Sequence, residues 1–234
     1  MNANGFEKLH GIDEMDEKQV LTLCRTAEWL TRQKLSGTIE LYRPVKVQTG
    51  RTPRQTGARR IRRTNVMKRI GILGAGTWGM ALARMLTVSG NDVLVWSAIE
   101  KEIDSLSTTR KHPNLPQMKI PDELRFTKSI EEVCKDKDIL LFAVPVRSTA
   151  AKARSYVADG QIIVDVAKGI EPDTLYTMTE ILADELGKEG GPKGVRLVAL
   201  SGPTHAEEVA IDLPTTIVSA SKDREAAAHV QGGS

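Results

Sequence analysis

A glycine-rich segment in the first half of the chain has the composition of a phosphate-binding turn. Gly74, Gly76 and Gly79 follow the apolar run 68–73 with the spacing G-x-G-x-x-G. In such a turn the first glycine permits a tight bend, the second leaves room for a pyrophosphate, and the third lets a helix pack closely. The helix that follows directs free amide hydrogens at the phosphates. An ordinary tight turn is the alternative, but the strand before and the helix after favour a dinucleotide site.

The acidic residue that usually binds the adenosine ribose is missing from its expected place. It is expected about twenty positions after the glycines, at the end of the second strand. Here that strand ends at Ser97 and Ala98, and the nearest acid is Glu100. No arginine stands there to hold a 2′-phosphate. The residues therefore leave the choice between NAD and NADP open.

Two later segments carry groups suited to an anionic ligand. Lys168 follows the apolar run 161–166, and Gly202 and Thr204 follow the run 195–200. Ligands of open α/β sheets bind beyond the carboxyl ends of the strands. An ammonium there can hold a phosphate or polarise a carbonyl. The alternatives are a solvated surface lysine and a helix cap at Thr204.

These candidate residues belong to an alternation of strands and helices. Near-continuous apolar runs indicate strands covered on both faces, and their alternation with helices predicts an α/β fold with a doubly wound, mostly parallel Rossmann sheet. The predicted strands are 68–73, 92–97, 138–144, 161–166, 195–200 and 215–219, and the predicted helices are 77–88, 129–135, 148–157, 173–186 and a short one after Pro203.

The composition of the whole chain is that of a soluble globular protein. It has 234 residues, a formal net charge of +3, 40% hydrophobic and 27% charged residues. Cys24 and Cys134 are far apart in sequence, which fits neither a disulfide framework nor a metal site. No apolar run is long enough to cross a bilayer, and the N-terminus lacks the core of a secretory signal. We expect a cytoplasmic protein without membrane insertion or metal.

Residues 1–66 differ in composition from residues 67–234. The stretch 13–35 predicts one amphipathic helix, whereas 48–66 is basic and poor in apolar residues and is predicted to be disordered. This division predicts an N-terminal extension followed by an NAD(P)-binding Rossmann domain. Clustered arginines could bind nucleic acid, but without interleaved aromatic residues we do not expect it. The other readings are a passive extension, or translated non-coding sequence upstream of Met67.

Five segments, taken together and in order, resemble the bacterial NAD(P)-dependent glycerol-3-phosphate dehydrogenases. KGIE and SGPTHAEE, at their separation and after the glycine turn, make the resemblance specific; it covers the chain from Met67 to about Val230. The segments are IGILGAGTWGMALARML from Ile70, NLP from Asn114, VP from Val144, VAKGIE from Val166 and SGPTHAEEV from Ser201.

The resemblance implies interconversion of dihydroxyacetone phosphate and sn-glycerol 3-phosphate with NAD(P)H, for glycerophospholipid synthesis. His205 is not required by this family, so we read it as non-catalytic. From the residues alone, Trp78 fits either a cofactor wall or core packing. The implied cofactor contacts are Gly74, Gly76, Thr77, Trp78, Gly79, Lys168 and Ala206, and the implied substrate contacts are Lys168, Gly202 and Thr204.

Three features depart from the family's pattern. Ala98 stands where many relatives carry Arg or His, and Val146 follows Pro145 where relatives have Ser or Thr and a longer turn. Relatives also continue into a helical domain that holds the proton acceptor and groups for the substrate phosphate, and a full-length relative is expected to form a homodimer. We therefore assign no catalytic residue to this chain and expect it to be inactive alone. The alternatives are a nucleotide-binding module without catalysis and a two-domain 3-hydroxyacid or ketopantoate reductase.

Overall fold

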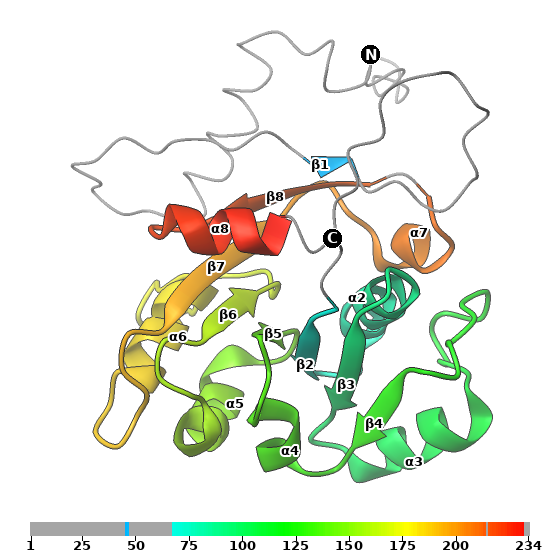
Figure 1. The fold of residues 1–234 in the computed structure, drawn as a ribbon, viewed down its shortest axis with the longest axis horizontal. Helices are drawn as coiled ribbons and strands as arrows, with labels where there is room; N and C mark the ends of the chain where they lie inside the picture. Colours follow the sequence, from blue (N-terminus) through cyan, green and yellow to red (C-terminus); the bar gives the residue numbers. More distant parts are fainter. Residues whose placement is uncertain (1–44, 47–66, 214, 232–234) are drawn as a thin grey trace, which may run out of the picture.

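The computed structural model describes residues 45–46, 67–213 and 215–231, which form a sheet between two layers of helices (Figure 1). The strand order is β1-β8-β7-β6-β5-β2-β3-β4. The strands are β1 (Val45–Lys46), β2 (Arg69–Leu73), β3 (Asp92–Trp96), β4 (Arg125–Thr127), β5 (Ile139–Phe142), β6 (Ile162–Asp165), β7 (Arg196–Ser201) and β8 (Thr216–Ala220).

The strands from β2 to β7 are parallel to their neighbours, whereas β8 pairs antiparallel with β7. β1 pairs antiparallel with β8, with Val45 opposite Ile217 and Lys46 opposite Thr216. The predicted doubly wound, mostly parallel sheet is thus confirmed. The predicted helix 13–35 and the predicted disorder of 48–66 lie outside the described residues.

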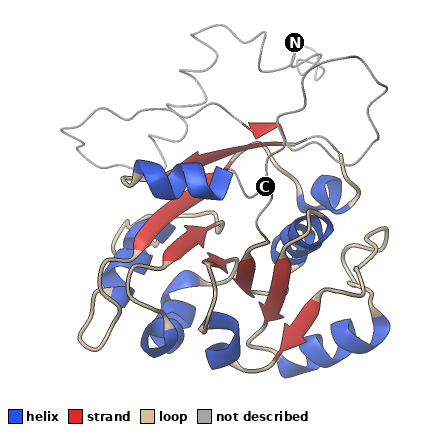
Figure 2. Cartoon of the chain, viewed as in Figure 1, coloured by secondary structure: helices blue, strands red, loops and turns tan. Residues whose placement is uncertain are grey.

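Helices cover both faces of the sheet (Figure 2). Side chains of a strand alternate between the faces, so Ile139 and Leu141 of β5 join one core and Leu140 and Phe142 join the other. One face is covered by α2 (Thr77–Val88), α3 (Glu100–Thr109), α7 (Ala206–Ala210) and α8 (Arg224–Gln231), and the other by α4 (Ile130–Cys134), α5 (Val146–Ala153) and α6 (Met178–Leu186).

Some elements differ from the sequence prediction for identifiable reasons. α3 was not predicted because it buries only Ile103 and Leu106. α6 begins at Met178 rather than at 173, because Thr177 and Glu180 form a capping box. α5 begins at Val146, directly after Pro145, and a short 3-10 turn over residues 154–156 continues it. β4, α8 and the short β1 were also not predicted. No helix among the described residues is long and apolar enough to cross a membrane.

The strand order reverses direction between β2 and β5. From β2 the chain adds β3 and β4 on one side, and from β5 it adds β6 and β7 on the other. A crevice opens at such a reversal, beyond the carboxyl ends of the strands, and ligands of open α/β sheets bind there. The glycine turn, Lys168 and Gly202 follow the carboxyl ends of β2, β6 and β7 in turn. The fold therefore puts all the sequence-predicted site segments on one edge.

Candidate functional site

Gly74 meets two separate demands of the turn after β2. Its φ of +125° lies in a region that favours glycine. A Cβ at this position would also lie 2.6 Å from the Ala143 carbonyl oxygen, in the turn after β5. Its amide donates to the Trp96 carbonyl oxygen at 2.7 Å. Gly74 thus joins the turn to the ends of both neighbouring strands.

Gly79 and Gly76 differ sharply in what surrounds them. A Cβ on Gly79 would lie 2.2 Å from the Gly74 carbonyl oxygen, so this glycine lets α2 pack on the turn. A Cβ on Gly76 would have no atom within 4 Å, and its φ of −66° suits any residue. Nothing within the described protein requires glycine at position 76. The open space before it is the room that a pyrophosphate needs.

The start of α2 is electrostatically suited to an anion. Gly76 is the N-cap, and no acidic residue occurs in the first turn. The first amides of a helix have no intrahelical acceptor, and the positive end of the helix dipole lies there. Together with the space before Gly76, this arrangement fits a bound dinucleotide.

Trp78 and Ala206 lie at the border of the same core. Both are partly buried and pack against the core cluster shared by α2 and α7. Thr77, which precedes Trp78 in the first turn of α2, is also half-buried. Core packing therefore accounts for part of the Trp78 side chain, and α7 lies beside the helix that begins at the glycine turn.

Lys168 and Thr204 are brought together from different strands. Lys168 is exposed, and its Nζ donates to the Thr204 carbonyl oxygen at 3.5 Å. The Thr204 amide donates to the Gly202 carbonyl oxygen at 2.9 Å. The three predicted substrate contacts thus form one group. The helix-cap alternative for Thr204 is wrong, because the N-cap of α7 is His205.

Gly202 is required by the neighbouring strand. A Cβ there would lie 2.4 Å from the Thr216 carbonyl oxygen at the start of β8.

The two groups of site residues are separated along the sheet. From β2 to β7 there are three strand spacings, or about 14 Å at about 4.8 Å each. The glycine turn and the Lys168 group therefore stand apart along one edge of the sheet, as the two halves of an extended ligand would require.

A buried carboxyl anchors the backbone just before Lys168. Asp165, at the end of β6, accepts hydrogen bonds from the Ala167 amide at 2.9 Å and the Thr179 hydroxyl at 3.3 Å. Burial raises the pKa of Asp165 to about 7, against the lowering effect of these two donors. This carboxyl therefore changes its ionisation near neutral pH while holding the turn that leads to Lys168.

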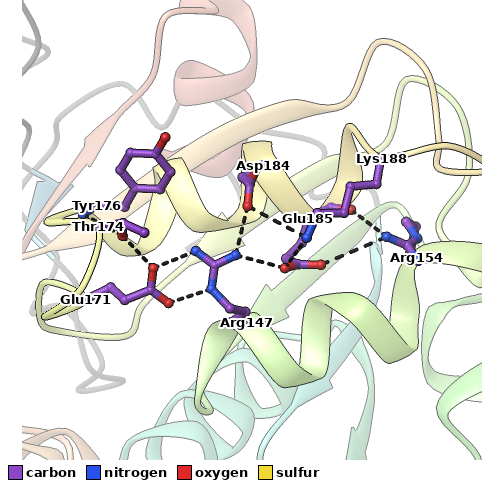
Figure 3. Close-up of polar contacts among 8 residues, drawn as sticks. All are labelled: Arg147, Arg154, Glu171, Thr174, Tyr176, Asp184, Glu185 and Lys188. Atoms are coloured by element: carbon purple, nitrogen blue, oxygen red, sulfur yellow. Dashed lines mark hydrogen bonds and ion pairs between the residues drawn. The ribbon is translucent and has the colours of Figure 1, made fainter.

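An ionic cluster holds the loop after Lys168 (Figure 3). The Arg147 guanidinium donates to both carboxylate oxygens of Glu171 at 2.5 Å, and to Asp184 and Glu185 at 2.8 Å each. Hydrogen bonds from Arg147 and then Thr174 lower the pKa of Glu171 to about 2. The cluster ties the loop to α5 and α6. Sequence reasoning noted the altered turn after Pro145 but had no signal for these partners.

A carboxylate does reach the end of β3, but from a helix. The Ser97 hydroxyl donates to Glu102 Oε2 at 2.5 Å and accepts from the Ile99 amide at 3.2 Å. Glu102 lies in the first turn of α3, and Ala98, which follows Ser97, is exposed. Glu102 was not among the expected acids, because a ribose-binding carboxylate is expected at the end of the strand and Glu100 is the nearest acid in sequence. The signal that could have found it was a second acid beyond Glu100, in the first turn of a helix.

Comparisons with known proteins identify relatives of the described sheet. The model for the N-terminus of NAD-dependent glycerol-3-phosphate dehydrogenases matches residues 69–227. Glycerol-3-phosphate dehydrogenase (NAD(P)+) 2 of Lactobacillus delbrueckii subsp. bulgaricus is 66% identical over 168 residues, which are 70% of this chain and 50% of the relative. The glycerol-3-phosphate dehydrogenase (NAD(P)+) of Agathobacter rectalis is 44% identical over 169 residues, or 70% and 48% of the two chains.

A solved structure also matches this chain over about half of its own length. The crystal structure of glycerol-3-phosphate dehydrogenase from Coxiella burnetii is 26% identical, with a TM-score of 0.60. The match covers 70% of this chain and 50% of the other. The chain thus spans about half the length of the relatives it matches.

Proposed function

The chain belongs to the NAD-dependent glycerol-3-phosphate dehydrogenases by its match to their N-terminal model, and on this premise we propose that residues 67–230 are a cofactor-binding half. The observation that carries the proposal is the open space before Gly76, at the start of α2 and at the reversal point of the sheet. Gly74, Gly76 and Gly79 form the turn, and the amides of Thr77 and Trp78 face the pyrophosphate. Ala206 borders the same ligand.

The cofactor is NAD or NADP, and the reaction is interconversion of dihydroxyacetone phosphate and sn-glycerol 3-phosphate. When bound, the nicotinamide supplies the hydride for this reduction. Lys168 touches cofactor and substrate, and its ammonium polarises a carbonyl or holds a phosphate. Gly202 and Thr204 line the substrate, and the contact from Lys168 to the Thr204 carbonyl oxygen supports this grouping.

The proposal also covers the metabolic role, the domain boundary and the partners of the protein. The glycerol 3-phosphate would serve glycerophospholipid synthesis in the cytoplasm, as the family resemblance suggests. The boundary of the cofactor domain would lie at Met67, where the composition of the chain changes; among the described residues, the buried hydrophobic side chains begin at Ile70. The full-length protein would form a homodimer, and the basic extension would bind no nucleic acid.

Fluorescence titration of the 234-residue chain with NADH and NADPH tests the cofactor half of the proposal. We expect saturable binding of at least one of them below about 1 mM, within the usual range for enzyme ligands. No saturable signal from either cofactor at that concentration would refute the proposal.

Phosphorus NMR of sn-glycerol 3-phosphate, in the presence of saturating NAD, tests the substrate half. We expect line broadening by the chain that Lys168→Met abolishes. Lys135→Met is the matched control, because Lys135 is an exposed lysine that precedes β5, at the opposite edge of the sheet. Equal broadening with Lys168→Met would remove that residue from the site. Tighter binding of a 3-hydroxyacid or of ketopantoate would favour the alternative reductase.

A further inference from the structure

A buried histidine contacts the glycine turn from a distant segment. His112 lies between α3 and β4 and is 3% exposed. Its Nε2 lies 3.2 Å from the Ala75 carbonyl oxygen, and its Nδ1 lies 3.2 Å from the Asn114 amide nitrogen. Ala75 stands between Gly74 and Gly76. The histidine therefore contacts the backbone of the turn itself, 37 residues away in sequence.

The two contacts determine which ring nitrogen carries the proton. The backbone N–H of Asn114 can only donate, so Nδ1 of His112 must accept from it. A neutral imidazole has one donor and one acceptor. Nε2 therefore carries the proton and donates to the Ala75 carbonyl oxygen. Only this tautomer satisfies both backbone neighbours.

The bond from His112 sets the direction of an amide in the turn. A peptide unit is planar and trans, so its carbonyl and its N–H point in opposite directions. When His112 holds the Ala75 carbonyl oxygen, it also fixes the Gly76 N–H in the same peptide plane. Gly76 is the N-cap of α2, and the side of its Cα where a Cβ would stand is open. Rotation of this one peptide would redirect an amide at the proposed phosphate position.

The histidine is itself held firmly. Leu115 and Met118, which follow it, are 3% and 5% exposed and pack in the core cluster that contains Ala75. The Leu115 amide donates to the His112 carbonyl oxygen at 3.1 Å. The segment is thus a packed turn, and its geometry allows the ring little freedom to leave Ala75.

We infer that His112 is a positioning residue for dinucleotide binding, which locks the Ala75–Gly76 peptide in the orientation that presents the Gly76 amide to the pyrophosphate. The inference rests on the proposed cofactor site. It goes beyond that site by adding a residue that acts through the turn without being a ligand contact. A merely structural histidine would affect stability without a selective effect on cofactor affinity.

Two substitutions of His112 test the roles of its two ring nitrogens separately. In His112→Gln, the side-chain amide nitrogen takes the place of Nε2 and still donates to Ala75. In His112→Asn, the amide oxygen takes the place of Nδ1 and accepts only from Asn114. NADH or NADPH titration of the full chain should give a dissociation constant within about threefold of wild type for His112→Gln. For His112→Asn we expect it to rise about tenfold, the effect of one lost hydrogen bond.

A stability control and a direct view of the ring complete the test. Leu124→Ala removes a fully buried side chain from the segment between His112 and β4 and leaves the hydrogen bond from His112 to Ala75 in place, so it should lower Tm but leave cofactor affinity within about threefold. Long-range ¹H–¹⁵N NMR of the wild-type ring should show the Nε2–H tautomer. Equal affinities of the Gln and Asn variants, or an Nδ1–H ring, would overturn the role of His112. Absence of cofactor binding by the wild-type chain would overturn the proposed function as well.

Discussion

At the scale of single residues, the three glycines of one turn differ in what surrounds them. Gly74 and Gly79 are confined by carbonyl oxygens of the protein itself, whereas Gly76 faces open space. The fold therefore demands glycine at the first and third positions. At the second position only a ligand would demand it, so substitutions at these positions should separate stability from binding.

We predict that Gly76→Val abolishes NAD(P)H binding while the sheet still folds. The branched side chain would occupy the proposed pyrophosphate position, and the cost to folding should be about 1 kcal/mol, from a less favourable N-cap. Gly79→Val should instead destabilise the fold by about 3 kcal/mol or more, because its Cβ meets the Gly74 carbonyl oxygen. Urea unfolding and cofactor titration measure the two effects. Unchanged affinity in Gly76→Val would show that this turn does not bind the cofactor.

Asp165 predicts a dependence of stability on pH. Its pKa in the folded protein is about 7, above the ordinary 3.8, so the folded state holds the proton more tightly. Stability from this group is therefore fully present below 3.8 and is lost as the pH rises through about 7. Asp165→Asn stays neutral, and its amide can still accept from Ala167 and donate to the Thr179 hydroxyl.

The gain in stability of Asp165→Asn over wild type should grow by about 2–3 kcal/mol between pH 5 and pH 8. Urea unfolding at a series of pH values measures it. Parallel stability curves for the two proteins would mean that Asp165 is not buried as a protonated acid.

The candidate site could be predicted in part at this scale. Gly74, Gly76 and Gly79 carry their spacing in the sequence, and Lys168 directly follows an apolar run. His112 and Arg147 gave no such signal. Their partners Ala75 and Glu171 lie 37 and 24 residues away, and only the folded chain brings each pair together.

At the scale of elements, the loop 168–177 is held by a side chain from a helix that begins unexpectedly early. α5 starts at Val146, so Arg147 lies in its first turn, facing Glu171 and α6. Long apolar elements were predictable because each carries its own periodicity. α3 and β4 were not, because they bury few apolar residues and depend on the sheet for their stability.

We predict that Arg147→Met lowers Tm by about 5 °C or more near neutral pH, because Glu171 loses its paired guanidinium, whereas Lys188 still pairs with Asp184 and Glu185. The pKa of Glu171 is depressed from 4.5 to about 2, so the stabilisation from its pairing is present above 4.5 and is lost as the pH falls toward 2. The Tm difference between variant and wild type should therefore shrink across that window.

The control for this experiment is Lys135→Met, which removes an exposed pair with Glu131 at 3.9 Å. Pairs of this kind contribute about 0–1 kcal/mol, so Tm should barely move. A similar loss of Tm in both variants, or a constant Tm difference at all pH values, would contradict a role for Arg147 in holding the loop.

At the scale of the whole molecule, two cores lie on opposite faces of one sheet, and the described residues that build them lie between Ile70 and Val230. This arrangement was predictable because continuous apolar strands alternate with amphipathic helices. The antiparallel pairing of β1 with β8 was not, because two residues carry no periodicity. That pairing is the one described link between residues 1–66 and the sheet, and it raises the question of how much the extension contributes.

We predict that deleting residues 1–66 changes Tm by no more than about 5 °C. The deletion removes a pairing of two residues, Val45 and Lys46, from the edge of β8, and leaves every described core residue in place. Each hydrogen bond lost at an edge costs about 0.5–1.5 kcal/mol, and water replaces it. One kcal/mol shifts Tm by about 2–4 °C in a domain of this size.

Deleting only residues 1–43 retains β1 and serves as the matched control. The longer deletion should also self-associate more readily, because it exposes the edge of β8. Thermal unfolding and light scattering measure the two effects. A loss of more than about 10 °C for the longer deletion alone would show that the extension is an integral part of the fold.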